Sequence, residues 1–150
     1  MEFKFTQWKK WNERDSFNDI NNPWIYILAI FNNWIPDWTV NIKDENIVYI
    51  WETCTQTLKI RLKQFNRSAF ENKDWHSWGW SYSSKYNKNF DNNWNNLYIS
   101  IFPVLETGFN YENDKDKDFI IGSYIRYVER KVILDFLLLH DWMKNLLNKK

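Results

Sequence analysis

The sequence predicts an α+β domain in which helices flank a small, mostly antiparallel three-stranded sheet. Three short runs are rich in β-branched and aromatic residues and are bounded by turn residues, as buried strands usually are; they are residues 24–30, 47–51 and 97–104. Two further segments, 55–65 and 124–145, carry apolar residues at helical spacing. Because 150 residues suffice for one core and are too few for two, we expect a single domain, residues 1–150.

The first two strands are expected to pair as an antiparallel hairpin. An N-terminal extension, residues 1–22, precedes them, and its loosely spaced apolar residues predict irregular structure or one short helix. Segment 32–46 contains a proline and many polar residues, so it is interpreted as a long connection between the two strands. The helix over 55–65 follows the second strand within a few residues.

The second half of the chain begins with a segment that has no clear period. Residues 72–96 are rich in Asn, Ser and Trp, and we expect a long ordered loop, because disordered segments are usually poor in aromatic residues. The third strand, 97–104, comes next. The charged segment 106–119 is interpreted as a solvated loop, and the final helix is predicted over 124–145 with Ser123 as its N-cap.

The charge and cysteine content exclude several classes of protein. Lys and Arg number 20 against 19 for Asp and Glu, so the net charge of +1 exerts no global attraction on polyanions, and a nucleic-acid site would be a local patch. The single cysteine, Cys54, excludes an internal disulfide and suits a reducing compartment. Cys and His are too few for a zinc cluster, so a bound metal would have oxygen ligands.

No segment has the pattern of a membrane or secretion signal. The N-terminus is charged and lacks an apolar core. The longest apolar runs fall well short of the roughly 20 residues that span a bilayer. We therefore expect a soluble, cytoplasmic protein that has no membrane partner.

Glu129 interrupts the apolar stripe of the last predicted helix. At about 100° per residue the stripe comprises Ile125, Val128, Val132, Phe136 and Leu139. A buried carboxylate is costly unless it is paired or bound to a metal. Glu129 therefore has two interpretations: a structural role, at the edge of the stripe or in an ion pair with an arginine such as Arg61, and a metal ligand.

A second apolar strip runs along the far side of the same helix. It contains Tyr127, Leu134 and Leu138. This strip indicates packing against the N-terminal segment or against another subunit, which would make the protein a homodimer.

Five segments carry short motifs in a fixed order along the chain. They are WIYIL at 24–28, VYIWET at 48–53, TQTLKIRLKQF at 55–65, YIRYVERKVILDF at 124–136 and LLNKK at 146–150. In their order and spacing they resemble the GIY-YIG nuclease superfamily, of which this chain would be a divergent member. The resemblance covers most of the chain from about residue 23 onward.

The resemblance implies metal-dependent hydrolysis of phosphodiester bonds in DNA, with Mg²⁺ or Mn²⁺ as the cofactor. Glu129 would hold the ion, Tyr26 would orient or deprotonate the attacking water, and Tyr49 would hydrogen-bond near the phosphate. Arg61 would neutralise the charge that develops on the phosphoryl oxygens. Asn148 would stabilise the site without touching the reacting atoms.

The motifs also depart from the family pattern. Trp24 and Trp51 stand where the two motifs have glycine, and Phe65 stands where the family has histidine or tyrosine. His76 would replace that residue if its loop folds over the cleft. The alternative function is therefore a catalytically degenerate domain that binds nucleic acid or a protein partner without cleavage.

Four further residues are candidates for nucleic-acid binding. Lys59, Lys63 and Arg67 lie on the helix that carries Arg61 and are either a solvated rim or phosphate contacts. Trp75 could stack on an unpaired base, since every base has a π face, or could pin its loop to the domain.

Overall fold

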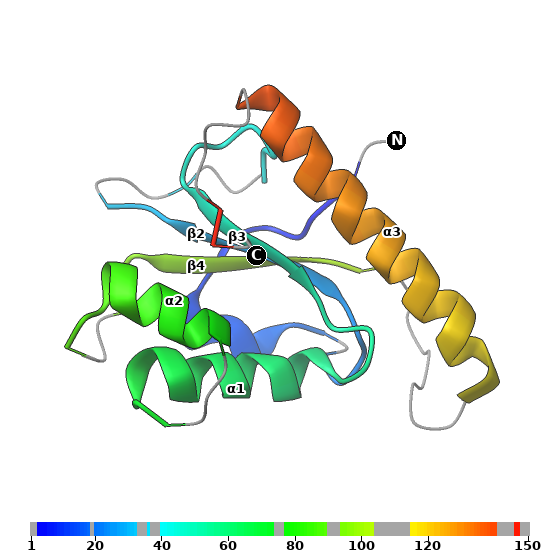
Figure 1. Cartoon of the computed structure of the whole chain (residues 1–150), viewed down its shortest axis with the longest axis horizontal. Coiled ribbons are helices and arrows are strands. Elements are labelled where there is room, and N and C mark those ends of the chain that lie inside the picture. Colours follow the sequence, from blue (N-terminus) through cyan, green and yellow to red (C-terminus); the bar gives the residue numbers. More distant parts are fainter. Residues whose placement is uncertain are drawn as a thin grey trace.

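The chain folds as an α+β structure with helices on both faces of one antiparallel sheet (Figure 1). A computed structural model describes residues 3–18, 20–32, 36, 40–73, 77–89, 94–103, 115–140 and 146–147, of which 115–119 are described by their backbone alone. The predicted α+β class is confirmed. The described residues form four strands, however, so the prediction of three is corrected.

Strand β2 (Ile25–Ile30) occupies the centre of the sheet. It pairs with β3 (Ile47–Glu52) on one side and with β4 (Leu97–Phe102) on the other, and the strand order is β1-β4-β2-β3. All three strands lie within two residues of the predicted bounds. Both faces of β2 are covered, which explains why its sequence is continuously apolar rather than alternating.

The fourth strand, β1 (Lys9–Lys10), comes from the N-terminal extension and pairs with the outer edge of β4. Nearby, the Thr6 backbone N–H donates to the Ile101 carbonyl at 2.8 Å, and the Ser100 hydroxyl donates to the Thr6 carbonyl at 2.6 Å. Two lysines have no β pattern of their own. The free edge of β4 supplies the pairing partner, so this strand could not be predicted from local sequence.

Strand β3 contains a bulge that changes which side chains share a face. Leu28 pairs with Tyr49 and Ala29 pairs with Ile47, so Val48 is the extra residue. Val48 and Tyr49 consequently pack in the same hydrophobic cluster, on the same face as Tyr26 and Leu28 of β2, whereas Ile47 packs on the opposite face.

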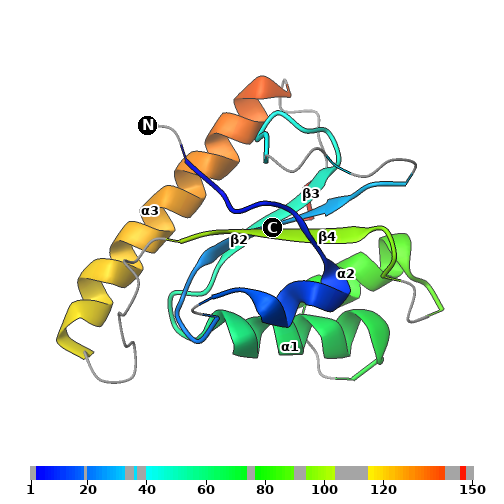
Figure 2. The same ribbon diagram turned by 180° about the vertical axis from the view of Figure 1, so that it is seen from behind.

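One face of the sheet is covered by three helices. They are η1 (Trp11–Ser16), a 3₁₀ helix, α1 (Leu58–Phe70) and α2 (Ser77–Tyr86). From behind, η1 lies along α1 (Figure 2), and the Trp11 and Phe65 rings meet at 5.1 Å. Helix α1 begins after the N-cap Thr57, whose hydroxyl accepts a bond from the Ile60 N–H at 3.3 Å. The helix predicted over 55–65 thus starts later and continues to Phe70.

Helix α2 lies inside the segment 72–96, which was predicted to be a long ordered loop, so that prediction is wrong. Its buried face has only Gly79, Tyr82 and Ser83. Serine and glycine supply little of the apolar periodicity on which helix prediction depends. The helix is held instead by close packing on α1.

Helix α3 (Lys115–Leu139) covers the other face of the sheet. Its start lies within the charged segment 106–119, which was predicted to be a loop, and Ser123 is an exposed residue inside the helix rather than its N-cap. Gly122 lies inside the helix and is buried, and a Cβ atom there would stand 3.7 Å from Cys54 Cβ. The helix ends at Leu139, short of the predicted position 145; residues 141–145 lie outside the described residues.

The C-terminal end of the chain returns to the sheet. Leu146 is buried, and the Leu147 N–H donates to the Val48 carbonyl on the outer edge of β3 at 2.8 Å. Among the described helices, none has the combination of length and apolar composition that crossing a membrane requires.

Candidate functional site

Tyr26 of β2 and Tyr49 of β3 lie side by side on the face of the sheet that α1 and α2 cover. Their ring centroids are 5.8 Å apart, their planes meet at 59°, and both residues are fully buried. The two tyrosines predicted from the motifs therefore share one environment, which is shielded from solvent.

Arg61 and Glu129 influence the pKa of both tyrosine hydroxyls. Burial is the largest cause that raises the pKa of the Tyr26 hydroxyl and of the Tyr49 hydroxyl. The guanidinium of Arg61 opposes this rise in both cases, and the carboxylate of Glu129 adds to it; Glu52 adds to it for Tyr26 alone. The structure thus brings four of the predicted site residues into one electrostatic environment.

The two phenol hydroxyls are poorly satisfied. Each influences the pKa of the other as a hydrogen-bonded neighbour would, yet neither has a partner of ordinary hydrogen-bond geometry among the described residues. Tyr26 and Tyr49 are therefore neighbours in ring contact rather than a hydrogen-bonded pair. A buried polar group without a partner costs about 1–3 kcal/mol, so this polar cluster lowers the stability of the fold.

Buried tyrosines make the protein sensitive to alkaline pH. Burial raises the pKa of Tyr82 to about 12, whereas tyrosines of the unfolded chain ionise near 10. The stability that the neutral phenol contributes is full below about pH 10 and is lost as the pH rises toward 12. We expect urea unfolding at pH 11 to give a free energy lower than at pH 8 by roughly 1 kcal/mol from Tyr82 alone. Tyr82→Phe should reduce this loss, and equal stability at the two pH values would contradict the assignment.

Two tryptophans pack against Tyr49. The Trp51 ring stacks on Tyr49 at 6.0 Å with an interplanar angle of 11°, and Trp78 of α2 lies 5.0 Å from Tyr49 and 5.1 Å from Trp51. Trp51 occupies the position where the resembled family has glycine. Its side chain therefore fills space beside the phenols that a glycine would leave open.

Burial makes the surroundings of the tyrosines a poor fit for a hydrated Mg²⁺ or Mn²⁺ ion. In the part of the chain that the structure describes, no three His, Cys, Asp or Glu side chains come together as a metal site. Glu129 is largely buried, and the Glu52 carboxylate already accepts a hydrogen bond from the Cys54 N–H. Mg²⁺ usually keeps several waters beside one or two carboxylates. A hydrated ion would need solvent access that fully buried phenols do not have.

A different site lies on the outer side of α1, where η1 runs beside it. It is a surface pocket of about 390 Å³, and its lining is Arg14, Asp15, Lys59, Lys63, Asn66, Arg67, Glu71 and Lys73. Five of these residues are cationic and two are acidic. The lining includes Lys59, Lys63 and Arg67, the three residues of α1 that were predicted to bind nucleic acid. We call it the basic pocket.

Three of the four basic side chains of α1 are arranged along one stripe of the helix. Lys59, Lys63 and Arg67 follow one another at four-residue intervals, so they lie one above the other. Like charges at this spacing destabilise a helix by about 0.2–0.5 kcal/mol per pair. Their presence on one stripe therefore has a cost in stability, which an anionic ligand would offset.

Helix η1 contributes Arg14 from the opposite wall of the pocket. Its guanidinium donates to the Trp11 carbonyl at 2.9 Å and lies over the Trp11 ring at 4.9 Å. The Trp11 indole N–H donates to the Asn66 side chain at 2.9 Å, which ties η1 to α1. Partial burial lowers the pKa of Arg14, whereas Asp15 and Glu71 raise it. An anion placed in the pocket would further favour the charged guanidinium.

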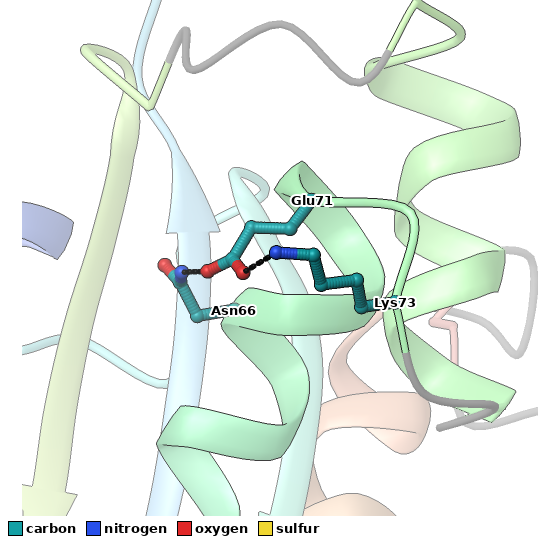
Figure 3. Close-up of polar contacts among 3 residues, drawn as sticks. All are labelled: Asn66, Glu71 and Lys73. Carbon is teal, nitrogen blue, oxygen red and sulfur yellow. Dashed lines mark hydrogen bonds and ion pairs between the residues drawn. The ribbon is translucent and has the colours of Figure 1, made fainter.

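The end of α1 shapes the rest of the pocket (Figure 3). The Asn66 amide donates to the Glu71 carboxylate at 3.0 Å, and the other oxygen of that carboxylate is 3.5 Å from Lys73 Nζ. Between them, Asn72 has a φ of 52°, a left-handed conformation that asparagine tolerates better than most residues. This turn directs Lys73 back toward α1, and the Lys73 N–H donates to the Arg67 carbonyl at 2.9 Å.

Three predicted site residues cannot be compared with the structure, because His76, Trp75 and Asn148 lie outside the described residues. Conversely, the sequence pattern did not indicate Arg14 and Lys73 as binding residues. Neither belongs to the helical pattern that selected the other cations. Their contribution depends on the packing of η1 and on the turn at Asn72, which local sequence does not indicate.

Comparison with protein-family models, with curated proteins and with solved structures gives no match to this chain. The resemblance to the GIY-YIG superfamily therefore stays a prediction that depends on the motif residues.

Proposed function

We propose that this protein binds nucleic acid through the basic pocket and does not cleave it. The observation that carries the proposal is the contrast between the two sites. The basic pocket is open to solvent and has five cationic residues against two acidic ones, whereas Tyr26 and Tyr49 are fully buried. A polyanion reaches the first site directly and has no route to the phenols without movement of the covering tryptophans.

The types of cation in the pocket suit a phosphodiester backbone. Arg14 and Arg67 offer planar guanidinium groups that can hold a phosphate through two hydrogen bonds, while Lys59, Lys63 and Lys73 offer compact point charges. Contacts of this kind fix the position of the backbone and carry no sequence information. We therefore expect binding that depends little on base sequence. The family resemblance favours DNA as the ligand.

Salt dependence tests this function directly. Binding of a fluorescently labelled 20-base-pair duplex, measured by anisotropy between 25 and 200 mM KCl, should weaken linearly on a double-logarithmic plot. The slope is about −0.9 for each phosphate neutralised, so the net positive charge of the pocket predicts a slope of about −3. Absence of binding at 25 mM KCl, or an affinity that does not change with salt, would reject the proposal.

A second candidate function, metal-dependent cleavage of DNA, is favoured by one observation. Arg61 and Glu129 both influence the pKa of both phenols, so the residues of the resembled active site lie near one another. We expect no cleavage nevertheless, because the phenols are closed off by Trp51 and Trp78.

The expected result with supercoiled plasmid and Mn²⁺ or Mg²⁺ is that the DNA stays intact from pH 6 to pH 9. Agarose gels of nicked and linear products provide the measurement. Nicking by the purified protein that disappears in Glu129→Ala, with an unchanged circular dichroism spectrum, would establish the nuclease. Nicking that persists in Glu129→Ala would indicate a contaminating enzyme.

A further inference from the structure

Helix α3 carries a row of exposed apolar residues on the side that faces away from the sheet. They are Ile120, Tyr124, Tyr127, Leu134 and Leu138, and their exposed fractions range from 41% to 72%. Among the described elements, α3 packs against β3 and β2 (Figure 1). Its buried stripe is a separate set of residues, which includes Val128 and Val132. The exposed row therefore takes no part in the core of the described fold.

The spacing of this row matches the surface that one α-helix presents to another in a coiled coil. Positions 120, 124, 127, 131, 134 and 138 are separated alternately by four and three residues. This is the a and d pattern of heptads, with position 124 as an a position. The one polar member is Lys131, at an a position, where a single lysine or asparagine specifies register and oligomeric state at some cost in stability.

The charges beside the row are complementary to those of a second copy in parallel orientation. Arg130 occupies a g position and Asp135 occupies the e position of the following heptad. In a parallel pair the g residue of one helix lies beside the e residue of the next heptad on the other, so each Arg130 would meet Asp135 of the second copy. Asp135 also pairs with Lys131 of its own helix, which offsets the two lysines that meet at the centre.

An antiparallel arrangement lacks this complementarity. Matching the apolar rows in that orientation brings Arg130 of one copy beside Arg130 of the other, and like charges in contact are unfavourable. From the heptad spacing and these charges we infer that α3 forms a parallel homodimer through the row of Ile120, Tyr124, Tyr127, Leu134 and Leu138. Dimerisation would leave the basic pocket accessible on both copies, because α1 and α3 cover opposite faces of the sheet.

Sedimentation equilibrium of the full chain over a range of concentrations tests the dimer. The wild-type protein should show a reversible monomer–dimer equilibrium, and Leu138→Glu should raise the dissociation constant of the dimer at least tenfold. Leu139→Glu is the matched control, because the neighbouring Leu139 is also exposed, at 46%, yet lies outside the row. The dissociation constant of its dimer should equal that of the wild type. A wild-type protein that is monomeric at every concentration, or equal effects of the two variants, would overturn the inference.

A cross-link tests the parallel orientation separately. Leu134 is a d position, so in a parallel pair Leu134→Cys meets its own copy and should form an intermolecular disulfide in oxidising buffer. Cys54 is buried, so the wild-type chain is the control and should stay monomeric on a non-reducing gel. A dimer by sedimentation that gives no Leu134→Cys cross-link would overturn the parallel arrangement. Lys131→Leu should tighten the dimer, since it removes the polar residue from the apolar row.

Discussion

The double variant Lys59→Glu/Lys63→Glu is expected to lose affinity for a DNA duplex by about 100-fold or more at 50 mM salt. Two cationic contacts disappear and two carboxylates take their place beside the phosphates. With about 1 kcal/mol for each unit-charge interaction at contact distance in a well-solvated site, the four charge changes sum to a few kcal/mol. Since 1.4 kcal/mol is tenfold, the predicted loss is at least two orders of magnitude.

The salt dependence of this variant should change together with its affinity. The two charge reversals change the net charge of the pocket lining from +3 to −1, so the salt slope should change from about −3 to near zero. Anisotropy titrations of wild type and variant at matched salt concentrations measure both quantities. Lys59 and Lys63 are exposed, so urea unfolding should give a nearly unchanged stability and thereby separate lost binding from lost folding.

A matched control is available on α2 and the turn that follows it. Lys85→Glu/Lys88→Glu makes the same change in net charge at two exposed lysines that are not part of the pocket lining. We expect its affinity to fall less than tenfold. Equal losses in the two double variants would mean that net charge alone decides binding, and the basic pocket would then not be the site.

The second large effect concerns stability: Gly79→Ala is expected to destabilise the fold by about 1–3 kcal/mol. A Cβ atom at Gly79 would stand 2.3 Å from Ser68 Cβ, 2.9 Å from the Ala69 nitrogen and 3.0 Å from the Phe65 carbonyl oxygen. In an exposed helix the same substitution would gain about 1 kcal/mol, because alanine is the better helix former. Here the steric clash with α1 outweighs the gain in helix propensity, since α2 cannot lie this close to α1 with any side chain at position 79.

Gly122→Ala in α3 provides the control for this prediction. Its Cβ would lie 3.7 Å from Cys54 Cβ, an ordinary van der Waals distance, so the substitution should stabilise the protein by up to about 1 kcal/mol. Urea unfolding measures the free energy of unfolding of both variants, which should fall for Gly79→Ala and rise for Gly122→Ala. In addition, Ser68→Gly should partly rescue Gly79→Ala, because it removes the atom nearest to the new methyl group. A stabilised Gly79→Ala variant would contradict the packing of α2 on α1.

Elements with a strong apolar pattern could be predicted from the sequence, and those held by tertiary packing could not. Strands β2, β3 and β4 are continuous apolar runs between turn residues, and the core positions of α1 have helical spacing. Strand β1 consists of two lysines, and α2 owes its position to the close approach at Gly79. The predicted start of helix α3, at residue 124, lies after its actual start at Lys115, because Gly122 and Ser123 resemble a helix boundary.

The candidate sites follow the same division. Strand pairing places Tyr26 beside Tyr49, and Arg61 and Glu129 both influence the pKa of their hydroxyls. The catalytic roles that the family motifs imply for these residues stay a prediction. The apolar runs that contain Tyr26 and Tyr49 indicate core packing, but the contact of Trp78 with Tyr49 was not predictable, because Trp78 belongs to α2. A helix missing from the prediction thus decides whether the site is open or closed.

The contact of Leu147 with β3 has a consequence for the behaviour of the protein during storage and expression. A free outer strand is a template for pairing with other molecules, and β3 is a long, apolar one. The bond from Leu147 to the Val48 carbonyl occupies part of that edge, while the opposite margin of the sheet is closed by a strand of only two lysines. Removal of residues 146–150 should therefore promote aggregation through the exposed backbone of β3, although the basic pocket would be untouched.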